Sequence, residues 1–373
     1  MSAGDIFKSI HEQTEGDSPP RRLSRQQIED LVSGGEVVSH ADCTAADFSG
    51  VNLAGGVFEQ VDFGKADLSG AHLNESIFLK STFAGANLTG ANLHLAMCNE
   101  CTFENARLGK ASLPVAKFID TNLSSVDLDG ADLACCALVR SDLTDTNLSN
   151  AHLNRASVLD CTLTNARLDG ADCEQALLMK VDFRDISISG AVFRQVLLYD
   201  CCFAQINMRG MDFSMSQFKG SDLRGADLSD AILTQASFME ADLSEARLEN
   251  VQANRGLFVK AKLLNAHIKG ALLRQSIFQE ADLTLADLTK ADAEASAFGK
   301  AICRGTKFCA ANLTDCDFSH ADLSGADMAG ANLFRTKLHR IKEEKTIWTG
   351  ANREAAFGTD PELAEAEQWQ PTL

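Results

Sequence analysis

The large apolar residues of this chain recur every five positions, a period that fits neither the 3.6 residues of a helical turn nor the two-residue alternation of a strand. Residues 321–333 read ADLSGADMAGANL, in which the large apolar slot falls on Leu323, Met328 and Leu333. In this register the slot repeats sixty times over residues 43–338, without an insertion or a deletion. A period this regular predicts one continuous repeat structure.

Two positions of each five-residue unit are expected to be buried. The large slot holds 31 Leu and 18 Phe, and the small slot two residues earlier holds Ala 33 times. None of these 120 positions is charged, although 23% of the chain is, because an unpaired charge is expelled from an apolar interior. One unit cannot bury its own leucine, so the units are expected to stack as a solenoid.

The phenylalanines indicate how many units make one turn. They recur in the large slot every twenty residues in an unbroken run: Phe218, Phe238, Phe258, Phe278, Phe298 and Phe318. Rings at this spacing would stack as a ladder if four units made one turn. The pattern therefore predicts a coil of twenty residues with four sides.

The units ADLSG at residues 66–70 and ADLSD at residues 226–230 match the motif A(D/N)LXX. Over residues 41–340 the chain resembles the pentapeptide-repeat proteins. This resemblance implies an all-β fold, a right-handed quadrilateral β-helix, and local signals at the termini add the expectation of short helical caps at both ends. Sixty units would make about 15 coils, and an inter-strand spacing of about 4.8 Å would make the rod roughly 70 Å long.

The period predicts one domain with a cap at each end. Its parts are an N-terminal tail and capping helix at residues 1–37, the β-helix at residues 38–340, and a C-terminal cap with a short acidic helix at residues 341–373.

Local signals predict the structure of the N-terminal cap. Ser24-Arg25-Gln26-Gln27 is a capping box that begins a helix at residues 24–33. Residues 4–13 are expected to form one weak helix, and residues 14–22 a flexible linker.

At the other end, Asp360-Pro361 is expected to begin a short helix. Trp348, Phe357 and Trp369 would cover the last coil or bridge to a second copy of it.

Nine of the twelve cysteines fall in buried slots, where they would act as small hydrophobes. Only Cys135, Cys202 and Cys309 are expected to point outward. Cys98 and Cys101 have CxxC spacing, but both would face the core and no second pair follows, so the spacing does not predict a zinc or redox site. Reduced thiols, no signal peptide and no run of 18 apolar residues predict a cytoplasmic location and no membrane span.

The sequence predicts no catalytic site, no cofactor and no metal. No two of the eight histidines lie twenty residues apart, so none would stack directly on adjacent coils. Aspartate is frequent one residue before the large slot, as at Asp62, Asp142 and Asp182. Such short side chains are expected to bond the local backbone rather than to serve general acid–base catalysis.

Function is therefore expected on the outer surface, where the four faces differ. The face over the phenylalanine ladder carries most of the outward apolar residues. Those expected to bind a partner are Ile119, Val139, Leu159, Leu177, Met179, Leu197, Tyr199, Leu257, Val259 and Ile277. A stripe of this size exceeds what a soluble monomer usually leaves in water. The alternative is that β-branched and aromatic residues are simply tolerated on a flat sheet.

The first functional hypothesis is a non-enzymatic rigid scaffold that binds another protein, or a second copy of itself, along this apolar face. The lead-in LSRQQIEDLVSGGEVV at residues 23–38 is similar to segments that precede pentapeptide arrays in proteins linked to bacterial type VI secretion, which implies an adaptor or effector-associated role.

The alternative hypothesis follows from the family resemblance, because some pentapeptide-repeat proteins imitate DNA and bind type II topoisomerases such as gyrase. Of the net charge of −18, −3 lies in residues 1–40 and −4 in residues 341–373, which leaves −11 for the repeats. That is one charge per roughly 6 Å, against one per about 1.7 Å in B-DNA. Direct nucleic-acid binding is not expected.

Overall fold

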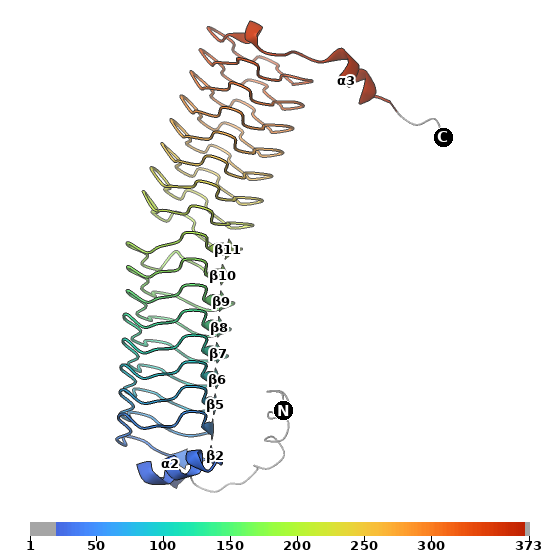
Figure 1. Cartoon of the computed structure of the whole chain (residues 1–373). Helices are drawn as coiled ribbons and strands as arrows, with labels where there is room; N and C mark the ends of the chain where they lie inside the picture. The colour runs from blue at the N-terminus through green and yellow to red at the C-terminus, as the bar shows by residue number, and fades with distance from the viewer. Residues whose placement is uncertain (1–19, 370–373) are drawn as a thin grey trace.

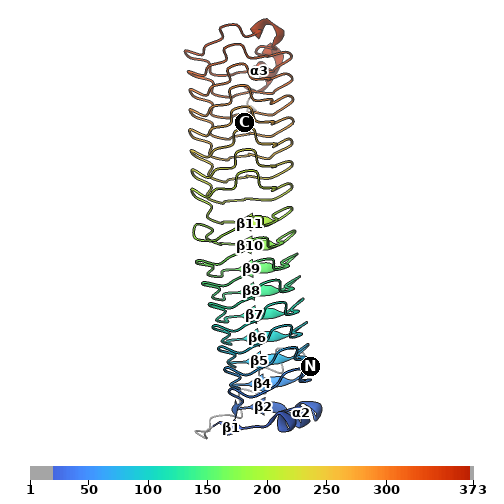
Figure 2. The same ribbon diagram turned by 90° about the vertical axis from the view of Figure 1, so that its left-hand side faces the viewer.

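The computed structural model describes residues 20–369, which form one four-sided rod (Figures 1 and 2). Strand partners are parallel and always lie twenty residues apart, from Arg21 with Ala41 to Lys337 with Phe357. The predicted twenty-residue coil is therefore confirmed, and the fold is a parallel β-helix.

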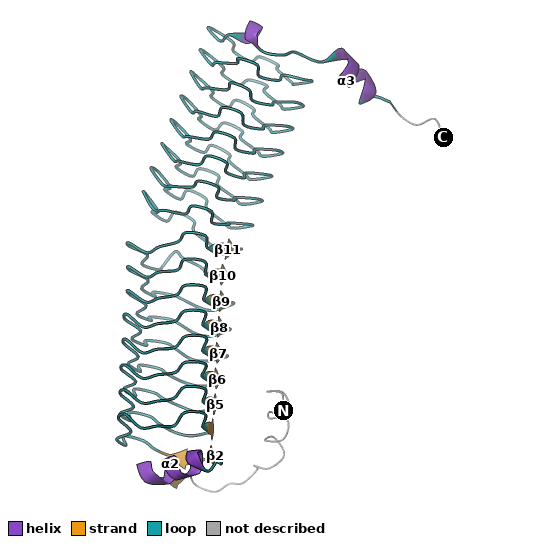
Figure 3. Cartoon of the chain, in the orientation of Figure 1, coloured by secondary structure: helices purple, strands orange, loops and turns teal. Residues whose placement is uncertain are grey.

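One face of the rod carries a regular nine-stranded sheet. Its strands are β2 (Val37–Ser39), β4 (Val57–Glu59), β5 (Ile77–Leu79), β6 (Met97–Asn99), β7 (Lys117–Ile119), β8 (Ala137–Val139), β9 (Ser157–Leu159), β10 (Leu177–Met179) and β11 (Leu197–Tyr199). Beyond β11 the coils continue with isolated bridges, so most of the rod is drawn as loop in Figure 3. Regular strands thus occupy nine turns, fewer than the about 15 coils expected, although pairing at the same spacing continues. We call the side that carries this sheet the strand face throughout the rod.

The core is the stack of large and small slots. Every large slot from Cys43 to Leu338 is buried, which confirms the inside–outside register. The predicted phenylalanine ladder is present: Phe258 stacks on Phe238 at 5.1 Å and on Phe278 at 4.7 Å between ring centroids, with planes 9° and 4° apart. Offset rings at this distance add about 0.5–1.5 kcal/mol per pair to the burial of their area.

The corners of the coil place the fifth residue of the unit in the left-handed region, with the exception of Asp185. Gly50 has φ of +60°, and Lys65 reaches +56° although it has a side chain. A hydrogen bond closes most corners, as from the N–H of Val51 to the carbonyl of Phe48 at 3.1 Å. Glycine therefore relieves the strain of this conformation where it occurs, but the stacked coils also hold other residues in it.

The N-terminal cap agrees with its capping box. Helix α2 (Arg25–Ser33) begins after Ser24, whose side chain accepts from the N–H of Gln27 while the Gln27 side chain accepts from the N–H of Ser24. The linker predicted for residues 14–22 is wrong at Arg21–Arg22, which forms β1 and pairs with β3 (Ala41–Asp42). The pairing occurs because the edge of the first coil offers free backbone groups. The weak helix predicted at residues 4–13 lies outside the described residues.

At the C-terminal end, pairing continues beyond residue 340 as far as Phe357, because Ile347 and Trp348 keep the five-residue register. Trp348 packs against the core, and the guanidinium of Arg353 lies 4.5 Å from its ring centroid. Phe357 and Trp369 are 56% and 74% exposed, so the expectation that they cover the last coil is wrong.

A short 3-10 helix η1 (Arg353–Ala355) follows the last coil, and helix α3 (Pro361–Ala366) then extends from the rod on its strand side (Figure 1). The carboxylate of Asp360 caps α3 by accepting from the N–H groups of Glu362 and Leu363, as the Asp360-Pro361 signal predicts. Within residues 20–369, no helix has the length and apolar character to cross a bilayer.

Candidate protein-binding face

The strand face turns its two outer positions in each coil toward solvent, because side chains alternate along a strand. In β10, Leu177 and Met179 flank the buried Leu178, and in β11 Leu197 and Tyr199 occupy the same positions. All ten residues predicted to bind a partner lie at such positions, and all ten are half-buried.

The structure divides the ten residues into two groups. The N-terminal patch lies on β7–β11 and comprises Ile119, Val139, Leu159, Leu177, Met179, Leu197 and Tyr199. The C-terminal patch comprises Leu257, Val259 and Ile277, beyond the last regular strand. The polar side chains of Gln217, Lys219 and Ser237 interrupt the stripe between them. The stripe predicted from the sequence is therefore continuous only along the N-terminal patch.

Strand register makes a continuous apolar row within the N-terminal patch. Ile119 pairs with Val139, Val139 with Leu159, Leu159 with Met179, and Met179 with Tyr199. Five apolar side chains thus lie on adjacent strands about 4.8 Å apart. The Tyr199 hydroxyl donates to Gln217 Oε1 at 2.9 Å, which closes the row with a polar contact.

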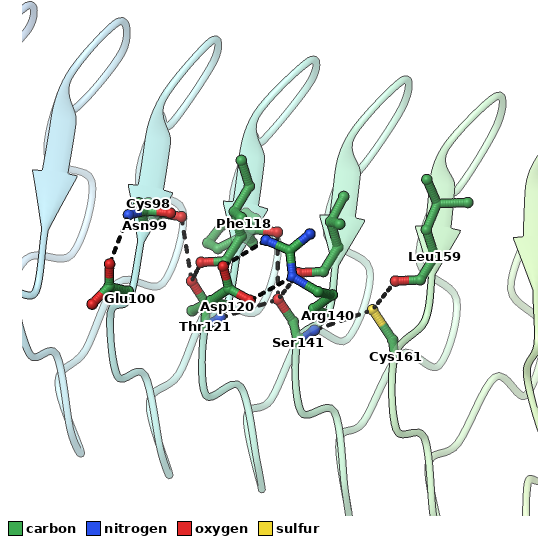
Figure 4. Close-up of polar contacts among 12 residues, drawn as sticks. Cys98, Asn99, Glu100, Phe118, Asp120, Thr121, Arg140, Ser141, Leu159 and Cys161 are labelled. Atoms are coloured by element: carbon green, nitrogen blue, oxygen red, sulfur yellow. Dashed lines mark hydrogen bonds and ion pairs between the residues drawn. The ribbon is translucent and has the colours of Figure 1, made fainter. Parts of the chain in front are cut away.

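Ion pairs border this row along the next corner of the coil. Arg140 donates from Nε and Nη2 to the two carboxylate oxygens of Asp120 at 2.7 and 2.6 Å (Figure 4). Two coils further along, Lys180 Nζ donates to Asp160 Oδ1 at 2.8 Å. The Arg140 hydrogen bond lowers the pKa of Asp120, and the Asp120 hydrogen bond raises the pKa of Arg140. The corner charges therefore neutralise one another across adjacent coils.

Beneath this border runs a column of buried hydroxyls and thiols that the sequence analysis did not assign. The Thr121 hydroxyl donates to the carbonyl of Cys98 at 3.3 Å, and the Ser141 hydroxyl donates to the carbonyl of Phe118 at 3.4 Å (Figure 4). The thiol of Cys161 donates to the carbonyl of Leu138 at 3.4 Å. Each side chain thus reaches the backbone of the preceding coil.

This column supplies backbone hydrogen bonds that are missing from the corners on this face between Phe58 and Leu198, which we call open corners. Among the described residues, these corners lack the hydrogen bond that closes the other three corners of the coil. From Phe218 onward the bond is present, as from the N–H of Ala241 to the carbonyl of Phe238 at 3.1 Å. In this column the small slot holds Ser, Thr or Cys, with Val at positions 61 and 181, and changes to Ala after Ser221, where the closed corners no longer need a side chain to supply the missing bond.

All twelve cysteines are free thiols, and the nine predicted to be buried are buried. Of the three predicted to point outward, Cys135 is exposed and Cys202 and Cys309 are half-buried. Burial raises the pKa of Cys173 to about 12, and it also raises the pKa of Cys98 well above its ordinary value. Cys98 and Cys173 are therefore protonated and poor metal ligands at neutral pH.

The frequent aspartates serve local structure. Asp142 Oδ1 accepts from the N–H of Thr144 at 2.9 Å, two residues on. Asp182 also pairs with Arg184, whose Nη2 lies 2.6 Å from Oδ2, and this hydrogen bond lowers the pKa of Asp182. These carboxylates are engaged in corners and ion pairs.

One titratable cluster appears that the sequence analysis missed, because its other members are 19, 20 and 47 residues from His320 in the chain. Glu367, just after α3, accepts from His320 Nε2 at 3.0 Å and from Arg340 Nη1 at 2.8 Å, and it lies 3.4 Å from His339 Nε2. Desolvation raises the pKa of Glu367, but the hydrogen bonds from Arg340 and the histidines outweigh it and lower the pKa to about 2.

Three of these groups, on His320, His339 and Glu367, lie close enough together to hold a metal ion. Two features favour an ion-pair clamp instead. His339 Nδ1 accepts from the N–H of Asp360 at 3.1 Å, so the ring proton of neutral His339 resides on Nε2, the nitrogen that faces Glu367. Arg340 supplies a positive charge at the same carboxylate. The cluster therefore fastens α3 to the last coils.

The comparisons with known proteins agree with the repeat architecture. A model described as pentapeptide repeats matches in eight copies, at residues 41–78, 66–97, 96–134, 159–195, 191–230, 216–252, 258–298 and 301–340. These segments together span more than half of the chain. No curated protein matches.

Two solved structures illustrate the similarity. A trypsin-treated form of QnrB1, a plasmid-mediated fluoroquinolone resistance protein, is 18% identical with a TM-score of 0.38, over 48% of this chain and 90% of that one. HetL, a pentapeptide repeat protein involved in heterocyst differentiation regulation from the cyanobacterium Nostoc sp. strain PCC 7120, is 22% identical with a TM-score of 0.26, over 91% and 98%. On the match of the repeat model, the chain belongs to the pentapeptide-repeat family.

Proposed function

We propose that this protein is a non-enzymatic rigid scaffold whose N-terminal patch binds another protein. The observation that carries the proposal is the row from Ile119 to Tyr199, in which each side chain is half-buried and stacks on the next. The row lies on a regular sheet, so its backbone does not have to become ordered when a partner binds. Burial of this row against a partner would contribute about 25 cal/mol for each Å² removed from water.

The border of the patch supports contact through apolar surface rather than through charge. Asp120 and Asp160 already pair with Arg140 and Lys180, so a partner would gain little by replacing these contacts. Exposed pairs of this kind influence association rate and register more than affinity. A partner with an elongated apolar ridge would fit the row.

The finer form of the proposal is an adaptor or effector-associated scaffold of a bacterial secretion system. It rests on the resemblance of the lead-in at residues 23–38, whose capping helix α2 contacts the first coil through the buried Ile28. The scaffold proposal itself does not depend on this pathway.

The alternative of a DNA-mimic that binds a topoisomerase has weaker support. It requires a dense field of free carboxylates, whereas Asp142, Asp182 and Asp222 are hydrogen-bonded to their own corners and the last two also pair with arginine. Pairing with arginine cancels the charge that would imitate a phosphate.

The test is the double variant Leu159→Arg with Leu177→Glu, on adjacent coils of the N-terminal patch. Both side chains point away from the core, so each change should cost at most about 0.5 kcal/mol of folding stability. Partner capture from the source cell, followed by a measured Kd with the identified partner, should weaken at least about tenfold, equivalent to about 1.4 kcal/mol.

The matched control is Thr164→Arg with Thr162→Glu, which places the same two charges on exposed positions of another face. It should bind as the wild type does. Equal binding by both double variants would refute the proposal. Loss of self-association alone, measured by light scattering, would identify the partner as a second copy. Loss of topoisomerase inhibition when Asp142, Asp145, Asp182 and Asp185 are neutralised together would favour the DNA-mimic.

A further inference from the structure

Backbone pairing fails at one place in the middle of the rod. In intact coils the N–H of each large-slot residue donates to the next coil, as from Leu168 to Ser187 and from Leu228 to Arg247, both at 2.7 Å. Among the described residues, the corresponding N–H groups of Ile188 and Phe193 have no backbone partner. We call this break, between residues 186–193 and residues 206–213, the seam.

Other observations agree that the coils are separated at the seam. The bridges expected between Ser187 and Asn207 and between Val192 and Asp212 are missing, whereas equivalent bridges occur in the coils on both sides. Phe193 and Phe213 are 5.6 Å apart with planes at 27°, whereas Phe218 and Phe238 are 4.8 Å apart at 6°.

Side chains in the small slot are uncovered there as well. Ala191, Ile206 and Met211 are only partly buried, although this slot is otherwise almost uniformly buried. A hollow of about 770 Å³ opens over the seam. Its lining includes Ile186, Ile188, Ile206, Met211 and the ion pair of Arg209 with Asp230.

The cause is visible in the sequence once the columns are known. The small slot holds alanine at Ala166 and Ala226, but the two coils between them place Ile186 directly under Ile206. In the next column, Met211 lies between two alanines, the first of which is Ala191. Large side chains in a slot sized for alanine overpack the interior, and overpacking typically costs 1–3 kcal/mol unless the backbone moves apart.

The seam does not cross the strand face. There β10 and β11 remain paired, and the N–H of Leu198 donates to the carbonyl of Gln217 at 2.7 Å. The corner at Gln195 is likewise paired, to Ser214 at 2.9 Å. On the face that follows the strand face, pairing fails one coil earlier, between Leu163 and Asp182. The breaks therefore touch three faces in two successive pairs of coils, because at the level of the seam Phe183 still donates to Cys202 at 2.8 Å. The strand face is the one face that is paired in both pairs of coils.

The shape of the rod agrees with this arrangement. In Figure 1 the coils that follow β11 lean toward the side that carries the strands. When coils separate on the faces other than the strand face, those faces become longer than the strand face. The rod therefore bends, and its strand face becomes concave. The bend lies just beyond Tyr199, where the N-terminal patch ends.

We infer that the rod consists of two stiff stacks joined by a hinge at the seam, with the strand face as the hinge line. Closing the seam straightens the rod, and opening it increases the concavity of the face that carries both apolar patches. The inference concerns the rod itself and holds whether or not the proposed scaffold function is correct.

Hydrogen exchange on the full chain tests the seam on which the hinge depends. The amides of Ile188, Phe193 and Asp212 should exchange at least about a hundredfold faster than that of Leu228, while the Leu198 amide stays protected, because the seam amides have no backbone partner and the strand face stays paired. Similar protection at Ile188 and Leu228 would overturn the inference, as would equally fast exchange at Leu198.

The variant Ile206→Ala with Met211→Ala restores the small residues of the neighbouring coils. It should slow exchange at Ile188 and Phe193 at least about tenfold, because the coils can then pair. The single variant Ile186→Ala should act in the same direction, which keeps the test valid if the double variant folds poorly. Unchanged or faster exchange in both would overturn the inference.

The reciprocal control is Ala226→Ile with Ala246→Ile, which extends the isoleucine column of Ile186 and Ile206 into an intact pair of coils. It should extend the separation into these coils, with faster exchange at Leu228 and no change at Leu168. Normal protection of Leu228 in this folded variant would show that oversized side chains do not separate coils and would refute the mechanism.

Discussion

Ser141 Oγ accepts a hydrogen bond from the N–H of Thr121, 3.2 Å away in the preceding coil. The same hydroxyl lies 3.4 Å from the carbonyl of Phe118 and 3.1 Å from that of Val139, to which it can donate. In a closed corner the Thr121 N–H would bond the Phe118 carbonyl directly. One buried side chain therefore takes the place of the missing bond of an open corner.

Ser141→Ala should destabilise the protein by about 1–3 kcal/mol, because it leaves a buried N–H and a buried carbonyl without a partner. Ser141→Cys should cost less, since Cys161 makes the equivalent contacts one coil later. Chemical unfolding of both variants measures the difference. Ala321→Ser is the control in a closed-corner coil and should give no gain. A Ser141→Ala protein as stable as the wild type would contradict this role.

The contribution of the Asp120–Arg140 ion pair to stability should decrease at low pH. The pKa of Asp120 is lowered by the Arg140 hydrogen bond, so the pair's contribution is complete above the ordinary aspartate pKa of 3.8 and is lost as the pH falls through the lowered value. In Arg140→Met the NMR titration midpoint of Asp120 should rise toward 3.8. Thermal stability at pH 7 should change by less than about 2 °C, because the pair is exposed. An unmoved midpoint would show that the pair does not form in solution.

The thiols should react in two classes. Cys135 should be labelled first by a thiol reagent, and the half-buried Cys202 and Cys309 more slowly. The nine buried thiols should react only on unfolding, because burial shields them from the reagent, and for Cys173 burial also raises the pKa to about 12. Mass spectrometry of labelled peptides, with unfolded protein as the reference, measures this order. Rapid labelling of Cys98 or Cys101 in folded protein would contradict the register.

Glu367→Gln should release α3 while leaving the rod intact, because the variant weakens the contacts with His320, His339 and Arg340 together. The lowered pKa of about 2 means that the clamp is complete above the ordinary value of 4.5 and is lost as the pH falls through about 2. Fast hydrogen exchange in residues 361–366, with unchanged exchange in the coils, is the expected result. Stabilisation of wild type by Zn²⁺ that Glu367→Gln abolishes would instead indicate a metal site.

The sequence by itself determined which side chains face the core. The five-residue period, the twenty-residue spacing of the phenylalanines and the absence of charge in two slots are local properties, and each unit obeys them independently. For that reason the burial of Phe258 and the outward direction of Leu159 could be predicted before any contact was known. The capping box at Ser24 is likewise a local signal, complete within four residues.

Only the tertiary structure decided how coils meet. The partners of Thr121 and Ile186 lie twenty residues away, and those of Glu367 lie up to 47 away, so their contacts depend on coil spacing and on the course of the C-terminal segment. Whether Ile186 and Ile206 fit together depends on the space between two backbones, which no single unit specifies. The period predicts that coils stack, whereas the open corners, the clamp and the seam follow from close packing, in which one extra methylene group is enough to move neighbouring atoms.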